Sequence, residues 1–357
     1  MNVKSLVARR TRGQQLARPR FGDPAELVSW MGAMQAQDYA ATKWAVGLRL
    51  RGSRPTDAMI ARALDEGTLI RTHVFRWTWQ LVTSGDARWM LGLVGARLLA
   101  RTTKRQRDLE IDRKLMTRSQ TVFEKALRRG DPLTREELGA ELAKARIDAS
   151  GPRLRHLVAI AELEGVVCNG ARRGKEHTYT LLDLRAPEAK LPSRDEALAT
   201  LALRYFQSHG PATMADFCWW TGLPPAECRG AVESIEKKLE SELVDGQRHW
   251  FVDDSRKPGS SGAIELLPAF DEWLVAYKNR EAVLEPKFTK RLNAGGGLLA
   301  PTVVQDGTVL ATWRRTLGRA GVSLAFDWFR PPTASVKRGV QEAALRYAQF
   351  LGLPLAP

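Results

Sequence analysis

Gln35, Gln37 and Asp38 place two neutral amides and a carboxylate close together in the sequence, a spacing that by itself is no evidence of a reaction. They stand where a run of apolar residues at helical spacing comes to an end. An amide does not titrate, so a glutamine accepts and donates hydrogen bonds but is no general base. Residues two positions apart lie on different faces of a helix. The two glutamines therefore work together only if the helix stops before them; the alternative is a polar helix end hydrogen-bonded to its own backbone.

Other kinds of reaction centre are not encoded. The sequence has no His/Cys cluster at metal-ligand spacing, no phosphate-binding glycine loop and no Gly-x-Ser-x-Gly elbow. The glycines at 295–297 lack the strand and lysine of a phosphate site, so we interpret them as a loop. The three cysteines, Cys168, Cys218 and Cys228, form no Cys-x-x-Cys pair, which fits a reducing compartment. We expect no metal and no cofactor.

The chain is strongly basic, with a net charge of +15 over 357 residues. Such a balance points first to nucleic acid and second to an anionic membrane surface, and the alternative is the general basicity of an arginine-rich proteome. No uncharged apolar stretch reaches the roughly 18 residues of a membrane span. The N-terminal residues also lack the apolar run of a signal peptide. We expect a cytoplasmic, nucleoid-associated protein with no membrane partner.

Residues 24–82 follow the order helix, helix, strands. Asp23 and Pro24 suit the cap and first turn of one helix, and residues 56–64 predict a second. Residues 69–82 are rich in aromatic and β-branched types, which predicts one or two strands. This order is typical of a winged helix with elaborations.

The clearest winged helix covers residues 119–182. Its predicted helices are 121–129, one that starts near Thr134 with Glu137 at capping-box spacing, and 152–164. Two strands then flank a basic turn at 170–175. In such units the third helix usually enters the major groove of DNA.

Residues 196–252 repeat this order, with a third helix predicted over 224–239. Acidic residues on that helix make it a poor candidate for DNA contact, so we interpret this copy as architectural. A linker is predicted at 256–262, followed by strands that include a hairpin at Asp306-Gly307. A final amphipathic helix is predicted over 333–351.

The fold class expected is α+β, with tandem winged-helix (helix-turn-helix) domains followed by a C-terminal β-barrel-like domain. The predicted domains are an N-terminal winged-helix unit with a basic helical connector (1–115), a second winged helix (116–190), a third winged helix (191–258) and a β-rich domain with a terminal helix (259–357).

Candidate DNA contacts are basic or polar side chains on the predicted strands, third helix, turn and C-terminal hairpin. They are Arg71, Arg76, Arg153, Arg155, His156, Arg172, Arg173, Lys175, Arg314 and Arg315. The alternatives are exposed strand arginines for the first two and a basic rim on a β-domain core for the last two. Residues 97–129, with eleven basic against four acidic side chains, form a basic helical stretch whose more usual role is a solvated helix face.

Several blocks, in order along nearly the whole chain, resemble one family. They are Met34-Gln35-Ala36-Gln37-Asp38, Lys43 to Arg49, Arg71 to Trp79, Leu267 to Leu274, Tyr277 to Arg280, and Gly307 to Arg314. Together they resemble the AlkZ-like DNA glycosylases, a branch of the AlkZ/YcaQ superfamily whose signature is Gln-x-Gln. The resemblance implies tandem winged helices closed by a C-terminal β-domain.

The resemblance also implies a reaction. Family members excise alkylated purines without a covalent enzyme intermediate, and the resemblance implies that Gln35 and Gln37 lie at the catalytic position. Asp38 is adjacent in the sequence and could act as a base or as an electrostatic support. An N3- or N7-alkylpurine is already cationic, so it leaves without an acid, and a positioned water and a stabilised cationic sugar suffice. This chain has Gln80 where many relatives have histidine, which puts the role of that position and the substrate range in doubt.

Two functions follow. The first is a monofunctional DNA glycosylase of base excision repair, a monomer that acts on N3- or N7-alkylated purines, bulky or cross-linked ones included, in double-stranded DNA. The alternative is a non-catalytic winged-helix DNA-binding protein or transcriptional regulator, which would read sequence through Arg153, Arg155 and His156, usually as a dimer. His73, Trp77 and Trp79 are expected to be packing residues in either case.

Overall fold

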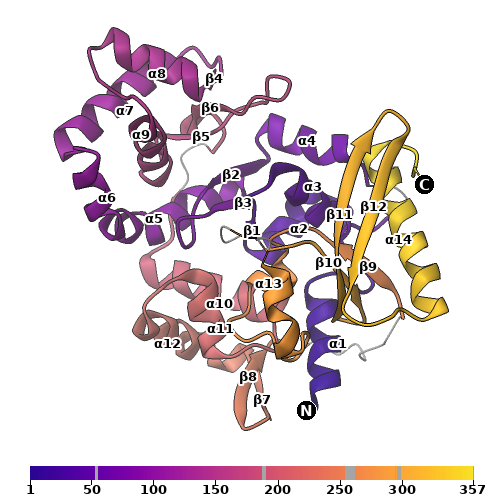
Figure 1. The fold of residues 1–357 in the computed structure, drawn as a ribbon. Coiled ribbons are helices and arrows are strands. Elements are labelled where there is room, and N and C mark those ends of the chain that lie inside the picture. Colours follow the sequence, from indigo (N-terminus) through magenta and orange to yellow (C-terminus); the bar gives the residue numbers. More distant parts are fainter. Residues whose placement is uncertain (53–54, 187–189, 254–261, 294, 296–298, 357) are drawn as a thin grey trace. The chain divides into compact units, whose positions relative to one another are not determined.

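The structure, a computed structural model, describes all residues except 53–54, 187–189, 254–261, 294, 296–298 and 357. The chain has a mixed α/β fold with two compact units (Figure 1). Unit 1 comprises Met1–Ala61 and Ala199–Pro357, and unit 2 comprises Arg62–Leu198. The predicted linker at 256–262 lies outside the described residues except for Gly262, as does the glycine run at 295–297 except for Gly295. The four predicted domains stay a prediction.

Unit 1 holds the N-terminal and C-terminal elements. Its helices are α1 (Val3–Gly13), α2 (Pro24–Met31), α3 (Tyr39–Gly47), α11 (Met214–Thr221), α12 (Pro225–Ser234), α13 (Glu272–Val275) and α14 (Ala334–Leu351), with 3₁₀ turns at Glu236–Lys238 and Pro286–Leu292. Its strands are β1 (Met34–Gln35), β7 (Glu240–Val244), β8 (Gln247–Phe251), β9 (Ile264–Leu267), β10 (Thr302–Gln305), β11 (Thr308–Gly318) and β12 (Gly321–Trp328). Helices α4 (Asp57–Glu66) and α10 (Arg194–Ser208) run across the unit boundaries.

Helix α2 ends before the chain reaches Gln35 and Gln37. The Asp23 carboxylate accepts hydrogen bonds from the first backbone N–H groups of α2, and Pro24 occupies the first turn, as predicted. Gly32, with a φ of 78°, ends this helix in a conformation that favours glycine. The two-residue strand β1 follows, and α3 begins only after Asp38. The helix break that the paired glutamines require is therefore confirmed.

The C-terminal strands form an open sheet rather than the expected barrel. Within the described residues the order is β12-β11-β10-β9, all antiparallel, with the predicted hairpin turn at Asp306-Gly307 (Figure 1). No pairing joins β9 to β12 in this part of the chain. The outer edge of β12 instead pairs at Val322 with the C-terminal tail, whose Pro354 carbonyl accepts from the Val322 N–H at 2.9 Å. The barrel prediction is wrong because this edge is already occupied.

A buried ion pair joins two distant segments of unit 1. The Arg49 guanidinium donates to both carboxylate oxygens of Asp271, at 2.8 and 2.7 Å. Arg49 is fully buried and Asp271 is 2% exposed. Removing one partner of such a pair leaves a buried charge and costs about 3–5 kcal/mol. This pair therefore fixes the segment after α3 against the residues that begin α13.

Unit 2 contains a strand pair followed by helices and a small sheet. Its elements are β2 (Leu69–His73), β3 (Trp79–Thr83), α5 (Ser84–Arg101), α6 (Thr103–Asp108), α7 (Arg113–Leu127), β4 (Leu133–Thr134), α8 (Arg135–Lys144), α9 (Pro152–Leu163), β5 (Val167–Asn169), β6 (Thr178–Leu181) and a 3₁₀ turn at Leu182–Leu184. Strands β2 and β3 pair antiparallel, and the other three strands form a sheet of order β4-β6-β5.

The ends of three helices can be compared with the boundaries predicted from the sequence. The Thr134 and Glu137 side chains form the predicted capping box at the start of α8. Helix α7 begins at Arg113 rather than residue 121, because the Asp112 carboxylate caps it by accepting from the Leu115 N–H at 2.7 Å. In unit 1, helix α12 ends at Ser234 rather than residue 239, and a 3₁₀ turn follows.

Candidate active site

Gln35 ends the two-residue strand β1, and Gln37 lies at the bend that follows it. Met34 and Ala36 are buried, whereas Gln35 is half-buried and Gln37 is exposed. The two amides are therefore the more exposed members of this run, next to the buried Met34 and Ala36.

Asp38 follows the glutamines and begins the next helix. Its Oδ1 accepts a hydrogen bond from the Ala41 N–H at 2.9 Å, which makes Asp38 the N-cap of α3. The residue is exposed. The capping contact anchors a carboxylate beside Gln37.

Glu272 lies directly behind Gln35. Its Oε1 accepts a hydrogen bond from the Gln35 backbone N–H at 2.6 Å, and its Oε2 accepts one from the Trp220 indole N–H at 3.0 Å. The residue is 1% exposed, so this carboxylate belongs to the interior of unit 1. The sequence analysis did not single out Glu272, although two adjacent acidic residues inside an apolar stretch were a signal that could have found it.

The neighbours of Glu272 are polar and mostly neutral. The His209 Nε2 atom lies 3.6 Å from Oε2, and burial is the main cause that lowers the pKa of this histidine. The Gln14 amide donates to the backbone carbonyl of Glu272 and to the Tyr277 hydroxyl. The adjacent Asp271 is already matched by Arg49. No short ion pair with an arginine or lysine is found for Glu272 in the described part of the chain.

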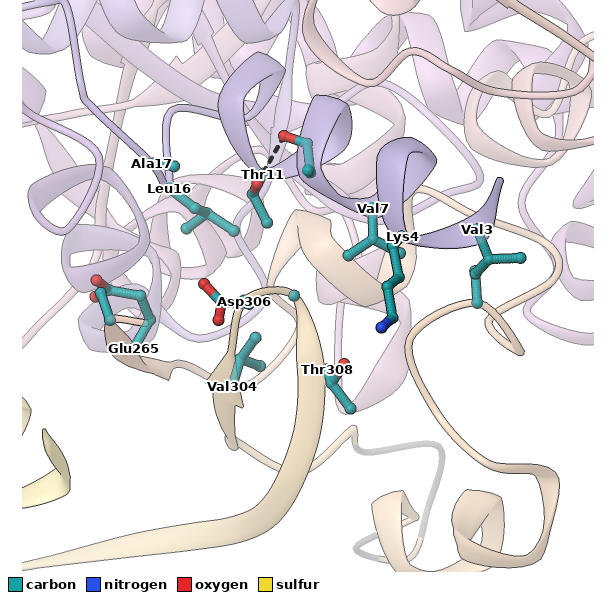
Figure 2. Close-up of a pocket in the computed structure, with 14 residues that line it drawn as sticks. Val3, Lys4, Val7, Thr11, Leu16, Ala17, Glu265, Val304, Asp306 and Thr308 are labelled. Atoms are coloured by element: carbon teal, nitrogen blue, oxygen red, sulfur yellow. Dashed lines mark hydrogen bonds between the residues drawn. The ribbon is translucent and has the colours of Figure 1, made fainter. Parts of the chain in front are cut away.

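A cavity of about 420 Å³ lies elsewhere in unit 1 (Figure 2). Lys4, Val7 and Thr11 of α1 line one side, and Val304 and Thr308 line the side that faces them. Neither Gln35 nor Gln37 lines this cavity. It is therefore not the place where the two amides would meet a substrate.

In unit 2, the residues near the β2–β3 hairpin pack among themselves. The Arg71 guanidinium lies 4.0 Å from the centre of the Trp79 ring, in cation–π contact. His73 Nδ1 lies 2.7 Å from a carboxylate oxygen of the buried Glu162. Gln80 is buried, and its amide donates to the Thr78 hydroxyl at 2.8 Å. A packing role for His73 and Trp79 is consistent with these contacts.

The hairpin turn itself is strained. Arg76 and Trp77 have backbone φ values of 55° and 58°, which residues other than glycine rarely adopt. The Trp77 ring stacks on His156 with the ring centres 5.5 Å apart and the planes 25° apart. His156 is 9% exposed, and burial, followed by the charge of Arg105, lowers its pKa. His156 therefore adds no positive charge near neutral pH.

The basic residues of the third helix and the turn differ in how firmly they are held. Arg153 donates to the Glu110 carbonyl at 2.9 Å, and Arg173 binds Glu137 at 2.7 Å and the Pro132 carbonyl at 2.8 Å. The Arg172 side chain contacts the Lys175 carbonyl.

By contrast, the side chains of Arg155 and Lys175 are exposed to solvent. A DNA phosphate would meet these two first.

On β11, Trp313 and Arg315 lie on the face that contacts Tyr347 of α14, and Arg314 lies on the opposite face. The Trp313 indole is buried and donates to the Leu267 carbonyl at 2.8 Å. Arg314 is exposed, and Arg315 contacts the Tyr347 hydroxyl of α14. The DNA contacts predicted from the sequence, including these two, stay predictions.

Comparison with known proteins identifies the family. The sequence model described as "DNA glycosylase AlkZ-like" matches residues 28–350. The chain belongs to the AlkZ-like DNA glycosylase family. Members of this family are hydrolases of N-glycosyl bonds, so the enzyme class expected from the Gln-x-Gln resemblance is confirmed.

Two comparisons lead to Streptomyces sahachiroi. The chain is 26% identical over 352 residues to an "Interstrand DNA cross-link repair glycosylase" from that organism, covering 93% of each chain. The solved structure of Streptomyces sahachiroi DNA glycosylase AlkZ superposes with a TM-score of 0.82 at 23% identity, covering 100% of this chain and 99% of that one. The AlkZ-like fold therefore extends over the whole chain.

Two absences complete the description of this AlkZ-like chain. Across the described residues, no group of three or more His, Cys, Asp or Glu side chains is placed to hold a metal ion. None of the helices in this same part of the chain is both long and apolar enough to span a bilayer.

The environment of His156 predicts a pH effect on stability. Because its pKa is lower in the folded than in the unfolded protein, the unfolded state binds more protons. The free energy of unfolding should therefore fall as the pH drops below the unfolded value of about 6.5, by at most about 1.4 kcal/mol per pH unit from this residue. Urea unfolding between pH 7.5 and 5.5 measures this slope.

His156→Phe keeps the ring that stacks on Trp77 and removes the titration. It should make the pH dependence shallower by the contribution of one histidine. An NMR titration that finds His156 protonated at pH 7 contradicts this account.

Proposed function

We propose that this chain is a monofunctional DNA glycosylase that removes N3- or N7-alkylated purines, bulky or cross-linked ones included, from double-stranded DNA in base excision repair. The observation that carries the proposal is the end of α2 before the glutamines, which leaves Gln35 half-buried and Gln37 exposed while Met34 and Ala36 are buried. Family membership supports the reaction class. The name of the Streptomyces sahachiroi relative supports the inclusion of cross-linked bases.

The proposed reaction is hydrolysis of a bond whose leaving group is already activated. The C1′–N bond of the alkylated nucleotide breaks, and its electron pair stays on the purine nitrogen. The cationic purine thereby becomes a neutral base, so no protein acid is needed. A water oxygen then forms a bond to C1′ and releases a proton to solvent, which leaves an abasic site. The main barrier is the formation of a cationic sugar.

Gln35 and Gln37 suit the two remaining tasks. Amide oxygens can accept hydrogen bonds from a water and direct its lone pair at C1′, and the amide N–H groups can hold a sugar or phosphate oxygen. The anchored Asp38 carboxylate next to Gln37 suits electrostatic support of a cationic sugar. Gln35, Gln37 and Asp38 are thus the proposed catalytic group.

We also propose that the helix-rich segments are winged-helix modules that hold DNA. The order α7, β4, α8, α9, β5, β6 supports this for unit 2, and the order α10, α11, α12, β7, β8 supports it for residues 191–258. The third helix of the first module, α9, would carry Arg153 and Arg155 toward DNA, whereas His156 on the same helix is buried against Trp77. The enzyme would act as a monomer, because one copy of each element suffices for this arrangement.

Excision is the direct test. Purified protein should convert N7-methylguanine in a DNA duplex into abasic sites, measured as strand cleavage after alkali. The double substitution Gln35→Ala and Gln37→Ala should lower the single-turnover rate by about 100-fold or more, because groups placed for the transition state are worth that much. Affinity for DNA with a tetrahydrofuran abasic site should change by less than about twofold.

Gln247→Ala is the matched control, since Gln247 is an exposed glutamine on another strand of unit 1. It should excise at the wild-type rate. If the double variant loses affinity as much as rate, the two amides serve binding and the catalytic assignment is wrong.

Salt dependence tests the DNA contacts. Each phosphate contact contributes about one to the slope of log affinity against log salt concentration. Arg155→Ala and Lys175→Ala should each reduce the slope by roughly that amount, because both side chains are exposed on unit 2. Arg173→Ala should change it less, since Glu137 already holds that guanidinium. Unchanged slopes for Arg155 and Lys175 would show that DNA does not bind this surface.

A further inference from the structure

We propose that Glu272 is a positioning residue of the active site: its buried carboxylate fixes the Gln35 backbone and supplies a negative charge that stabilises the cationic sugar. This inference rests on the proposed glycosylase function and deepens it. Nothing in the Gln-x-Gln motif itself requires an acid behind it.

Both carboxylate oxygens of Glu272 accept hydrogen bonds. A backbone N–H and an indole N–H can only donate, so both oxygens act as acceptors here. Hydrogen bonds to an ionised acceptor are stronger than neutral ones, and the 2.6 Å bond to the Gln35 N–H is short for its type.

The surroundings leave this charge largely unmatched. The neighbouring Asp271 takes both arms of Arg49. The buried Arg10, which lies over the Tyr277 ring, is 3.8 Å from Asp216. His209 Nε2 lies 3.6 Å from Glu272, and burial is the main cause that lowers the pKa of this histidine. The Tyr205 and Tyr277 hydroxyls in the same interior are kept neutral by burial, which raises the pKa of each. Three carboxylates, those of Asp216, Asp271 and Glu272, therefore share this interior with the two guanidiniums of Arg10 and Arg49.

A buried charge without an opposite charge beside it lowers the stability of the folded protein. A carboxylate at the position of Glu272 is therefore expected to serve a function. Interactions between charges are stronger at the lower effective dielectric of a protein interior than in water. The transition state of glycosidic cleavage carries positive charge on the sugar, and a carboxylate fixed behind Gln35 stabilises that charge without reorganisation. The same carboxylate fixes the Gln35 backbone at its N–H group. One residue thus both positions the amide and favours the cationic transition state.

Binding of a charged mimic separates these roles from simple packing. The probes are DNA duplexes with a cationic pyrrolidine in place of the damaged nucleoside and duplexes with the neutral tetrahydrofuran analogue. The wild-type protein should bind the pyrrolidine duplex at least about tenfold more tightly. Glu272→Gln should lose most of this preference and excise about 100-fold more slowly, the lower end of the range for one preorganised electrostatic contact. Its affinity for the tetrahydrofuran duplex should change by less than about twofold.

Two further variants control the experiment. Glu281→Gln makes the same chemical change at an exposed position of unit 1 and should behave as wild type. Glu272→Asp keeps the charge but withdraws the oxygen from Gln35, so it should retain most of the preference while excision slows. Equal preference in the wild type and Glu272→Gln overturns the proposal, as does complete loss in Glu272→Asp.

The outcomes also separate this inference from the proposed function. Should Glu272→Gln fail to fold, a wild-type protein without preference for the pyrrolidine duplex overturns the inference by itself. A wild-type protein that excises N7-methylguanine while Glu272→Gln does so equally well refutes the role of Glu272 alone. Absence of excision from every alkylated duplex refutes the proposed function instead.

Discussion

Two adjacent buried carboxylates, Asp271 and Glu272, are the constraint on which the candidate active site depends. Asp271 is matched by Arg49, and this pair fixes the end of α3 to the start of α13. Glu272 can then turn both oxygens toward fixed donors, one of which is the backbone of Gln35. Because buried charges are tolerated only with well-formed hydrogen bonds, the position of the glutamine segment is strongly determined. An amide does not change its protonation state, so it can act on a substrate only through the placement of its hydrogen bonds. Such placement requires a rigid support.

The positive charge of the chain is distributed between structure and binding. Arg49 and Arg71 are buried and engaged with Asp271 and Trp79, so they stabilise the fold in which they lie. Arg155 and Lys175 are exposed and can meet phosphates. The net charge of +15 therefore overstates the number of side chains ready for DNA. Exposure, rather than residue type, distinguishes the better candidates.

Local patterns in the sequence predicted much of the structure. The cap at Asp23, the capping box of Thr134 and Glu137, and the Asp306-Gly307 hairpin all depend on neighbours within a few residues. The start of α7 was missed because basic residues obscure its apolar face of Met116, Phe123 and Leu127. The open sheet and the Glu272–Gln35 contact could not be predicted, because they join segments far apart in sequence, 237 positions in the second case. No periodicity encodes such contacts.

A crystal structure of the protein bound to duplex DNA with the pyrrolidine abasic analogue tests the central claim most directly. The account predicts that the side chains of Gln35 and Gln37 approach the sugar ring to within about 3–3.5 Å, the distance of a reactive arrangement. Glu272 should still accept the hydrogen bond of the Gln35 N–H in that complex. The account is contradicted if the abasic sugar binds away from this segment, or if Glu272 releases Gln35 when DNA is bound.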